Sequence, residues 1–324
     1  MEFCQDYSTF FISQGRNRTE HARQYLSGLL GDIRRKNIER IGEKVADVSY
    51  QWVHNFVSES NWDYRALSMQ VAKDSNTLLG DRAESMLLID YRLYLPAGWT
   101  EDTKRLNRAK VPQDQREFKT KPELAWEIIE TAKANELQFS WIGMDSLYGS
   151  NSELLEKLEA DGLSYVADVR SNQKFYFKDA EGQLQYKRVD KVWIHWGAAQ
   201  AEHVYFRNAT KGPLRAQVLL QPIYSKDGST TTRSLIISLD GTGAIKYSLT
   251  NGEGTAREHC YRQHQRSWIE RAIQEAKSEV SMAAVSGAWL AGLASAHGHG
   301  HLGHALCLAV KARSSRHCSA AEYT

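Results

Sequence analysis

The chain has 324 residues, of which 42% are hydrophobic and 25% are charged. This is the composition of a globular protein with enough apolar residues for a sizeable core. The formal net charge of +2 excludes a uniformly basic nucleic-acid-binding protein and leaves only local patches for that purpose. No uninterrupted apolar run reaches about 18 residues, so we expect no transmembrane helix.

The cysteines and the first residues indicate a compartment. The four cysteines lack the spacing of a zinc ribbon or a disulfide framework, which favours a reducing environment. The first residues include Glu2 and Asp6 and contain no long apolar run, so no signal peptide is expected. We therefore expect a cytoplasmic protein.

Residues 19–80 have the pattern of successive helices. Apolar residues recur at spacings of three and four, as at Leu26, Leu29 and Ile33. Residues 34–36, with the sequence Arg-Arg-Lys, form a basic spot inside this region. A solvated helix face and a contact with DNA phosphates are both open interpretations of that spot.

The next part of the chain alternates strands and helices. Residues 86–90 and 139–145 are short apolar runs that each end in an aspartate, and residues 163–169 predict a third strand. Helices are predicted over residues 121–136, where a proline suits the first turn, and over 151–160. This alternation is typical of α/β architecture.

Residues 172–250 have a different pattern, rich in alternating and β-branched segments. A long amphipathic helix is predicted after it, over residues 256–282, with Trp268 and Ile269 on its apolar side. The fold class is therefore α/β, with a mixed sheet, flanking helices and a β-rich insertion before the last helix. The strands predicted within the insertion cover residues 174–177, 191–196, 203–207, 217–223, 234–238 and 246–249.

Three carboxylates are candidates for a metal site. Asp90 and Asp145 each end an apolar strand, and functional groups gather at the carboxyl ends of strands in open α/β sheets. Glu270 lies on the long predicted helix, where Arg266 and Lys277 fall on the same narrow stripe at about 100° per residue. Three converging carboxylates can hold two divalent ions about 3.5–4 Å apart, and magnesium suits all-oxygen ligands. The spacing alone is only weakly specific for such a site.

Several longer motifs in a fixed order carry a resemblance to a known family. Residues 25–45 and 89–102 resemble the N-terminal and central segments of a branch of bacterial insertion-sequence DDE transposases. The sequence WIGMDSLYG at 141–149 resembles the second-aspartate motif of the family, and residues 266–279 resemble its third-acid motif. The resemblance extends over residues 14–282.

The resemblance implies an RNase H-like fold in which a β-rich insertion precedes the glutamate helix. It assigns Asp145 as the second catalytic aspartate, Glu270 as the catalytic glutamate, and Arg266 and Lys277 as contacts to DNA phosphates. The implied activity is metal-dependent cleavage and transfer of DNA strands at transposon ends, with two Mg²⁺ or Mn²⁺ ions on the carboxylates. The implied partners are transposon-end DNA, target DNA and a second copy of the chain. Gln263 stands where the family usually has a tyrosine.

The region around the first aspartate departs from the family pattern. The family has a glycine- and lysine-rich stretch of several tens of residues before the segment that matches residues 91–96, and this stretch is missing here. Asp90 is either the first catalytic aspartate or the aspartate that precedes that segment, because a deletion between similar Leu-Ile-Asp sequences would merge the two. The loss of strands near this aspartate threatens the core as well as the chemistry.

The tail from residue 283 onward is a second departure. Its Gly-, Ala- and His-rich text, with four histidines between residues 297 and 304, can be interpreted as a metal-binding tract or as a reading-frame error. We favour the frame error, because permitted codons for residues 283–305 can encode the family's usual continuation in the +1 frame. We expect the tail to be poorly packed and its histidines to bind no metal in a defined site.

Three further residues have a structural and a functional interpretation. His195, which lies near two tryptophans, is expected to be a structural strand residue rather than a catalytic base. Asp168 ends a predicted strand and could bind a metal, although the resemblance assigns it no such role. Gly149 is expected to make a turn, since the sequence contains no phosphate-binding glycine motif.

Two functional hypotheses follow from these observations. In the first, the chain is a transposase whose activity in this copy is impaired by the two departures. In the second, it is a catalytically dead remnant that at most binds DNA. The expected regions are a helical, DNA-binding N-terminal region over 1–80, an RNase H-like core over 81–171 and 251–282, a β-rich insertion over 172–250 and an atypical tail over 283–324.

Overall fold

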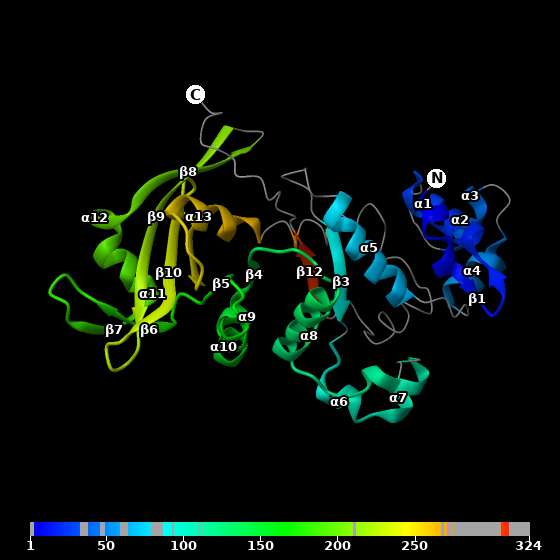
Figure 1. Ribbon diagram of the computed structural model, residues 1–324, viewed down its shortest axis with the longest axis horizontal. Coiled ribbons are helices and arrows are strands. Elements are labelled where there is room, and N and C mark those ends of the chain that lie inside the picture. Colours follow the sequence, from blue (N-terminus) through cyan, green and yellow to red (C-terminus); the bar gives the residue numbers. More distant parts are fainter. Residues whose placement is uncertain are drawn as a thin grey trace. The chain divides into compact units, whose positions relative to one another are not determined.

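The chain divides into two compact units (Figure 1). The helical unit comprises Met1–Gln138 and Ile269–Thr324, and the sheet unit comprises Phe139–Trp268. The computed structural model describes residues 3–32, 38–45, 49–58, 64–78, 87–92, 94–109, 111, 113–209, 212–266, 269–270, 274 and 306–310.

The helical unit begins with a group of amphipathic helices, which confirms the helical pattern predicted over residues 19–80. Their apolar faces meet in a small core around Tyr7, Phe11, Ala22 and Phe56. A neighbouring cluster is centred on the fully buried pair Ile41 and Val53. The elements are α1 (Phe3–Asp6), η1 (Ser8–Phe11), β1 (Ile12–Ser13), β2 (Arg16–Asn17), α2 (Thr19–Leu30), α3 (Ile38–Lys44), α4 (Tyr50–Ser58) and α5 (Tyr64–Leu78).

The rest of the helical unit places the strand that carries Asp90 beside helix α8 (Lys121–Ala134). This strand, β3 (Leu87–Arg92), pairs antiparallel with β12 (Leu306–Val310), so that Asp90 stands opposite Leu308. The predicted helix start is confirmed, because a reciprocal capping box between Thr120 and Glu123 opens α8. The elements between β3 and α8 are α6 (Ala97–Thr100), α7 (Thr103–Arg108) and η2 (Gln113–Gln115).

Strand β12 is the part of residues 283–324 that the structure describes. The expectation of a poorly packed tail and the four histidines between 297 and 304 otherwise lie outside the described residues.

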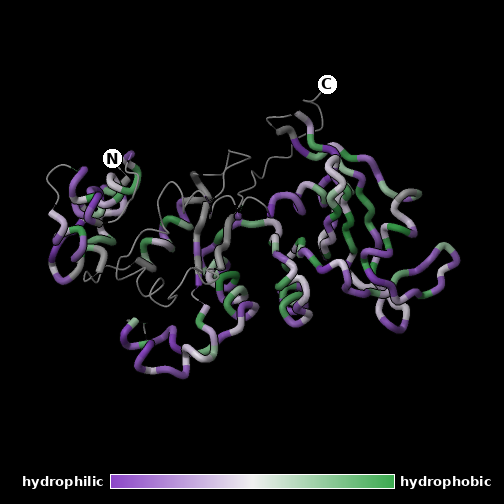
Figure 2. The backbone as a smooth tube through the Cα atoms, turned by 180° about the vertical axis from the view of Figure 1, so that it is seen from behind, coloured by the Kyte–Doolittle hydropathy of each residue, from purple (hydrophilic) through white to green (hydrophobic). Residues whose placement is uncertain are grey.

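The sheet unit is built on one eight-stranded mixed sheet in the order β4-β5-β11-β10-β9-β6-β7, with β8 paired to β9. Strands β4 and β5 are parallel, and every other pairing in this sheet is antiparallel. The central strands contain apolar stretches, which are green in Figure 2, and most of the apolar residues in them are buried. The strands are β4 (Ile142–Met144), β5 (Tyr165–Asp168), β6 (Lys174–Lys178), β7 (Leu184–Arg188), β8 (Glu202–Ala209), β9 (Gly212–Tyr224), β10 (Thr230–Asp240) and β11 (Ile245–Thr250).

Helix α13 (Ala256–Gln265) packs across β8, β9, β5 and β10 (Figure 1). Its buried residue Cys260 lies in one apolar cluster with Val166, Phe206 and Ile236. This confirms the first part of the helix predicted over residues 256–282. Most of the remainder lies outside the described residues.

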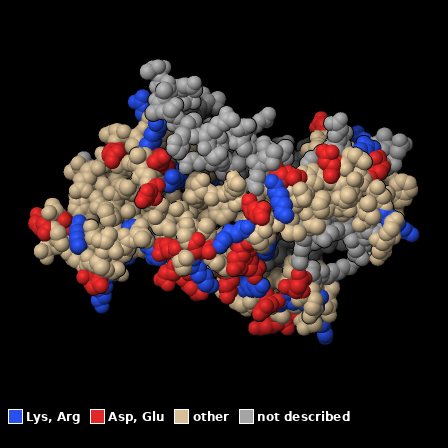
Figure 3. Space-filling view, viewed as in Figure 1, with Lys and Arg blue, Asp and Glu red and all other residues tan. Residues whose placement is uncertain are grey.

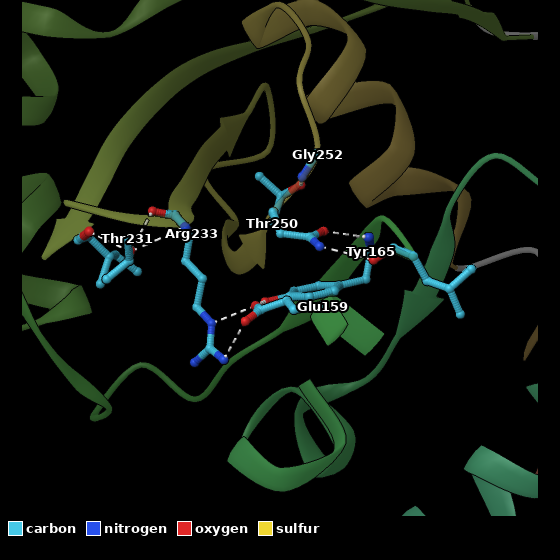
Figure 4. Close-up of polar contacts among 9 residues, drawn as sticks. Glu159, Tyr165, Thr231, Arg233, Thr250 and Gly252 are labelled. Atoms are coloured by element: carbon cyan, nitrogen blue, oxygen red, sulfur yellow. Dashed lines mark hydrogen bonds and ion pairs between the residues drawn. The ribbon is translucent and has the colours of Figure 1, made fainter. Parts of the chain in front are cut away.

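A half-buried carboxylate ties helix α10 (Ser152–Ala160) to the sheet (Figure 4). Arg233 on β10 donates to both carboxylate oxygens of Glu159 on α10, at 2.7 and 3.0 Å. The hydroxyl of Tyr165 on β5 donates to the same carboxylate at 2.7 Å. One carboxylate therefore joins a helix and two strands that are far apart in the sequence.

The strand predicted over residues 191–196 is wrong. The chain there is helical, through α11 (Val189–Val192), the π-helical turn η3 (Trp193–Gly197) and α12 (Ala198–Gln200). The physical reason is a helical spacing of the buried residues Val189, Val192 and Gly197, which outweighs the local alternation. The mixed α/β fold class predicted from the sequence is confirmed.

Candidate active site

Two aspartates stand at the same edge of the sheet unit, at the carboxyl ends of adjacent parallel strands. The last register pair of β4 and β5 joins Met144 to Ala167. Asp145 and Asp168 are the next residues on the two strands, so they occupy matching positions. Neighbouring strands lie about 4.8 Å apart, which places the two aspartate backbones side by side. The sequence predicted the strand end for each aspartate, and the structure adds their adjacency.

Asp145 is exposed, and its side chain has a defined local role. Its Oδ1 accepts a hydrogen bond from the backbone nitrogen of Leu147 at 2.8 Å and so caps helix α9 (Ser146–Gly149). The cap fixes the side chain at the strand end while leaving the carboxylate accessible to solvent. An exposed carboxylate held in this way is a suitable oxygen ligand for a divalent cation.

Asp168 is less exposed, and both of its oxygens are engaged. Ser248 donates from Oγ to Oδ1 at 2.7 Å, and the Arg266 Nε lies 2.8 Å from Oδ2. Burial raises the pKa of Asp168, and the contacts with Ser248 and Arg266 partly offset that effect. A carboxylate that is paired with a guanidinium is a poor metal ligand, which weakens the metal-binding interpretation of Asp168.

Asp90 belongs to the helical unit and forms an ion pair there. Its Oδ1 lies 2.6 Å from a terminal nitrogen of Arg92. Arg92 also donates to the hydroxyl of Thr131 on α8 at 2.8 Å, and its Nε lies 3.6 Å from a carboxylate oxygen of Glu127. Strand β3 is therefore attached to α8 through the cation beside Asp90.

Glu270 is helical and exposed, whereas Lys277 lies outside the described residues. Asp90 and Glu270 belong to the helical unit and Asp145 to the sheet unit, so their convergence stays a prediction. Among the residues that the structure describes, no group of three or more His, Cys, Asp or Glu side chains is close enough to hold a metal ion.

Other reactive side chains have structural surroundings. His195 lies on η3 rather than on a strand, is exposed, and has its Nδ1 at 3.0 Å from the carbonyl oxygen of Lys191. Cys260 is fully buried, and this burial raises the pKa of its thiol to about 12, so it is not a ready nucleophile. On the face seen in Figure 3, acidic and basic side chains are interspersed, in keeping with the small net charge.

The comparison with protein families is decisive for identity. The profile described as "DDE superfamily endonuclease" matches residues 10–90 and 82–190, which is more than half of the chain. The chain belongs to this family. The chain is also similar to the "Probable transposase for insertion sequence element IS701" of Microchaete diplosiphon. The two are 24% identical over an alignment 319 residues long, which covers 86% of this chain and 79% of the relative.

These matches confirm the predicted resemblance to insertion-sequence DDE transposases. The mixed sheet with flanking helices is consistent with the RNase H-like fold of such enzymes. DDE superfamily endonucleases depend on divalent metal ions and act on DNA. No helix within the described ranges is long and apolar enough to cross a membrane.

Proposed function

We propose that this transposase binds the ends of an insertion sequence and catalyses metal-dependent cleavage and transfer of DNA strands, and that this copy is impaired. The observation that carries the proposal is the exposed carboxylate of Asp145, capped in place at the carboxyl end of β4 within a DDE-family chain. The alternative is a catalytically dead remnant that at most binds DNA. A bacterial DNA substrate places either form in the cytoplasm.

In the active form, Asp145 and Glu270 are two ligands of the metal site and Asp90 is the third. Two Mg²⁺ or Mn²⁺ ions held there would activate a water or a 3′-hydroxyl and stabilise the leaving oxygen at phosphorus. Both Asp145 and Glu270 are exposed, as metal-binding carboxylates must be to reach a DNA substrate. Asp90 must give up its ion pair with Arg92 to serve in the same way, which is one reason to expect weak activity.

Arg266 and Lys277 are the proposed contacts to DNA phosphates. Each neutralised phosphate adds about 0.9 to the slope of log affinity against log salt concentration. Replacement of either residue by alanine should therefore weaken DNA binding and make the salt dependence shallower. An unchanged slope would assign these side chains to the support of the fold instead.

The first proposed cause of impairment is a deletion in the region of residues 82–90. The two stretches that match the family overlap there, as expected if two similar segments were merged by a deletion. The alignment with the Microchaete diplosiphon relative runs over 319 residues although it covers only 86% of this chain, so the relative has additional residues without a counterpart here. The additional residues of the relative favour a deletion in this chain, and the overlap of the two matched stretches favours the strand that carries Asp90 as its position.

A reading-frame error in the tail is the second proposed cause of impairment. Sequencing of the gene and of related copies of the element tests it directly. Intact relatives should continue past residue 283 in the other frame. An in-frame His-rich tail in those relatives would contradict the frame error and would call for a metal-binding measurement on the tail.

The proposed activity is tested by incubating the protein with DNA that carries the terminal repeats of the element, with Mg²⁺ or Mn²⁺. The Asp145→Asn variant is the control, because the amide keeps the size of the side chain but lacks the charge. Cleavage by the original chain that is lost in this variant supports the enzyme. The mass of the protein–DNA complex is expected to correspond to two copies of the chain. Absence of cleavage by the original chain, with or without DNA binding, supports the remnant and overturns the active enzyme.

A further inference from the structure

A continuous chain of hydrogen bonds runs through the interior of the sheet unit and ends at Arg266. Ser238 on β10 donates to Oε1 of Gln263 at 2.5 Å, and Nε2 of Gln263 donates to Oγ of Ser248 at 2.8 Å. Ser248 on β11 donates to Oδ1 of Asp168 at 2.7 Å. Oδ2 of Asp168 meets Nε of Arg266 at 2.8 Å. These hydrogen bonds therefore link strands β10 and β11, helix α13 and the end of β5.

The middle of this hydrogen-bond network is deeply buried, which limits its possible roles. Ser238, Ser248 and Gln263 are between 0% and 2% exposed, so each polar atom left without a partner would cost about 1–3 kcal/mol. Such a network gains little stability over an apolar core, but it fixes the orientation of its members. The group at its exposed end is Arg266, whose side chain is 29% exposed.

We propose that Asp168 is a positioning residue, which holds the guanidinium of Arg266 in place and is itself held by Ser248 and Gln263. The proposal rests on the proposed function, in which Arg266 contacts a DNA phosphate. Because Asp168 matches Asp145 across the β4–β5 register, it fixes Arg266 relative to the strand end that carries the metal ligand. Asp168 thereby acts through Arg266.

The proposal also gives a role to Gln263, which departs from the usual tyrosine of the family. Its amide accepts a hydrogen bond from Ser238 and donates one to Ser248, from two atoms of one planar group. A phenol carries both functions on a single oxygen and needs more space in a site that is only 2% exposed. The glutamine and the two serines therefore form a matched set in this chain.

A positioning role for Asp168 and a purely electrostatic role predict opposite changes in DNA affinity when its charge is removed. The loss of a negative charge next to a DNA-binding side chain strengthens DNA binding if nothing else changes. The loss of the group that positions Arg266 weakens it. The effect of Asp168→Asn on affinity therefore separates the two explanations.

A matched control exists within the same unit. The side chains of Glu159 and Asp168 are both 23% exposed. One oxygen of Glu159 lies 2.7 Å from Nε of Arg233, against 2.8 Å in the Asp168–Arg266 pair. Glu159→Gln removes one charge from a similar ion pair that has no contact with Arg266 among the described interactions. Any effect common to both variants then reflects the loss of an ion pair from the fold, and an effect of Asp168→Asn alone reflects the loss of contact with Arg266.

The first measurement needs no DNA. In ¹H–¹⁵N spectra of the full chain, the Nε–H signal of Arg266, assigned by its loss in Arg266→Lys, should exchange slowly with solvent. We expect at least tenfold faster exchange in Asp168→Asn and unchanged exchange in Glu159→Gln. If Asp168→Asn fails to fold, Ser248→Ala replaces it and should also accelerate the exchange. Unchanged exchange in the folded Asp168 or Ser248 variant would overturn the proposal.

The second measurement is binding to terminal-repeat DNA as a function of salt concentration. Asp168→Asn should bind more weakly, with a slope shallower by about one unit, and should add no further loss to Arg266→Ala. Tighter binding, or a loss equal to that of Glu159→Gln, would overturn the proposal. If the original chain binds no DNA, the proposed function fails, and the exchange rate of the Arg266 Nε–H still decides the role of Asp168.

Discussion

A β-carbon on Gly149 would stand 2.1 Å from the carbonyl oxygen of Asp168. It would also stand 3.1 Å from the β-carbon of Ala167. Helix α9, which Asp145 caps, therefore lies directly on the end of β5. The sequence predicted a turn at Gly149, but this glycine ends a helix, and the close approach is what requires it.

We predict that Gly149→Ala destabilises the sheet unit by about 1–3 kcal/mol, because a backbone oxygen cannot move aside as a flexible side chain can. The measurement is the free energy of unfolding in urea. Gly241→Ala is the control, since a β-carbon at Gly241 meets nothing within 4 Å. Equal stabilities of the two variants would contradict the close approach.

Glu159 carries a second prediction, because it accepts hydrogen bonds from both Arg233 and Tyr165 (Figure 4). Glu159→Ala leaves both donors without this acceptor and should cost about 1–3 kcal/mol of unfolding free energy. Glu153→Ala on the same helix removes an exposed ion pair with Lys157 and should cost less than about 1 kcal/mol. A urea titration of both variants checks the difference, and a cost at Glu153 as large as at Glu159 would refute it.

The thiol of Cys260 should be unreactive in the folded protein. Burial raises its pKa to about 12 from an ordinary value of 9.0, which lowers the thiolate fraction roughly a thousandfold near pH 8. Mass spectrometry after treatment with iodoacetamide should find Cys260 unmodified in the native chain and modified in urea. Rapid native labelling would contradict the burial of the Cys260 side chain between α13 and the sheet.

The pH dependence of stability should reflect two histidines of α13, the buried His259 and the half-buried His264. Burial lowers the pKa of His259 and His264 below 6.5, and nearby cations reinforce this, so the unfolded chain binds more protons than the folded chain just below 6.5. Stability should therefore fall as the pH decreases through about 6.5 toward the lowered values. Urea midpoints between about pH 7 and about pH 5.5 measure this. The double variant His259→Gln and His264→Gln should show a flatter profile, and an equally steep one would assign the effect elsewhere.

The sequence predicted most elements because their signals are local. The proline in the first turn of the helix predicted from residue 121 and the apolar runs that end at Asp145 and Asp168 are examples, and the structure places all three as expected. The error at residues 191–196 arose because Val192, Ile194 and Trp196 alternate like a strand. Tertiary packing instead buries Val192 and leaves Ile194 66% exposed.

The surroundings of Arg266 could not be predicted, because its partner Asp168 lies on a strand far away in the sequence. The pairing depends on strand register and on the position of α13, which no local pattern encodes. Gln263 was visible only as a departure from the family. Its bonds to Ser238 and Ser248 required the folded arrangement of β10 and β11.

The most direct test of the central claim, that Asp145 and Glu270 share one metal site, is backbone cleavage by bound ferrous iron. Fe²⁺ can replace Mg²⁺ on oxygen ligands, and with ascorbate and peroxide it cuts the chain next to its ligands. We predict cuts near both Asp145 and Glu270 that excess Mg²⁺ suppresses and that Asp145→Asn abolishes at both positions. Cuts near Glu270 that persist in the Asp145→Asn variant, or their absence in the original chain, would contradict the shared site.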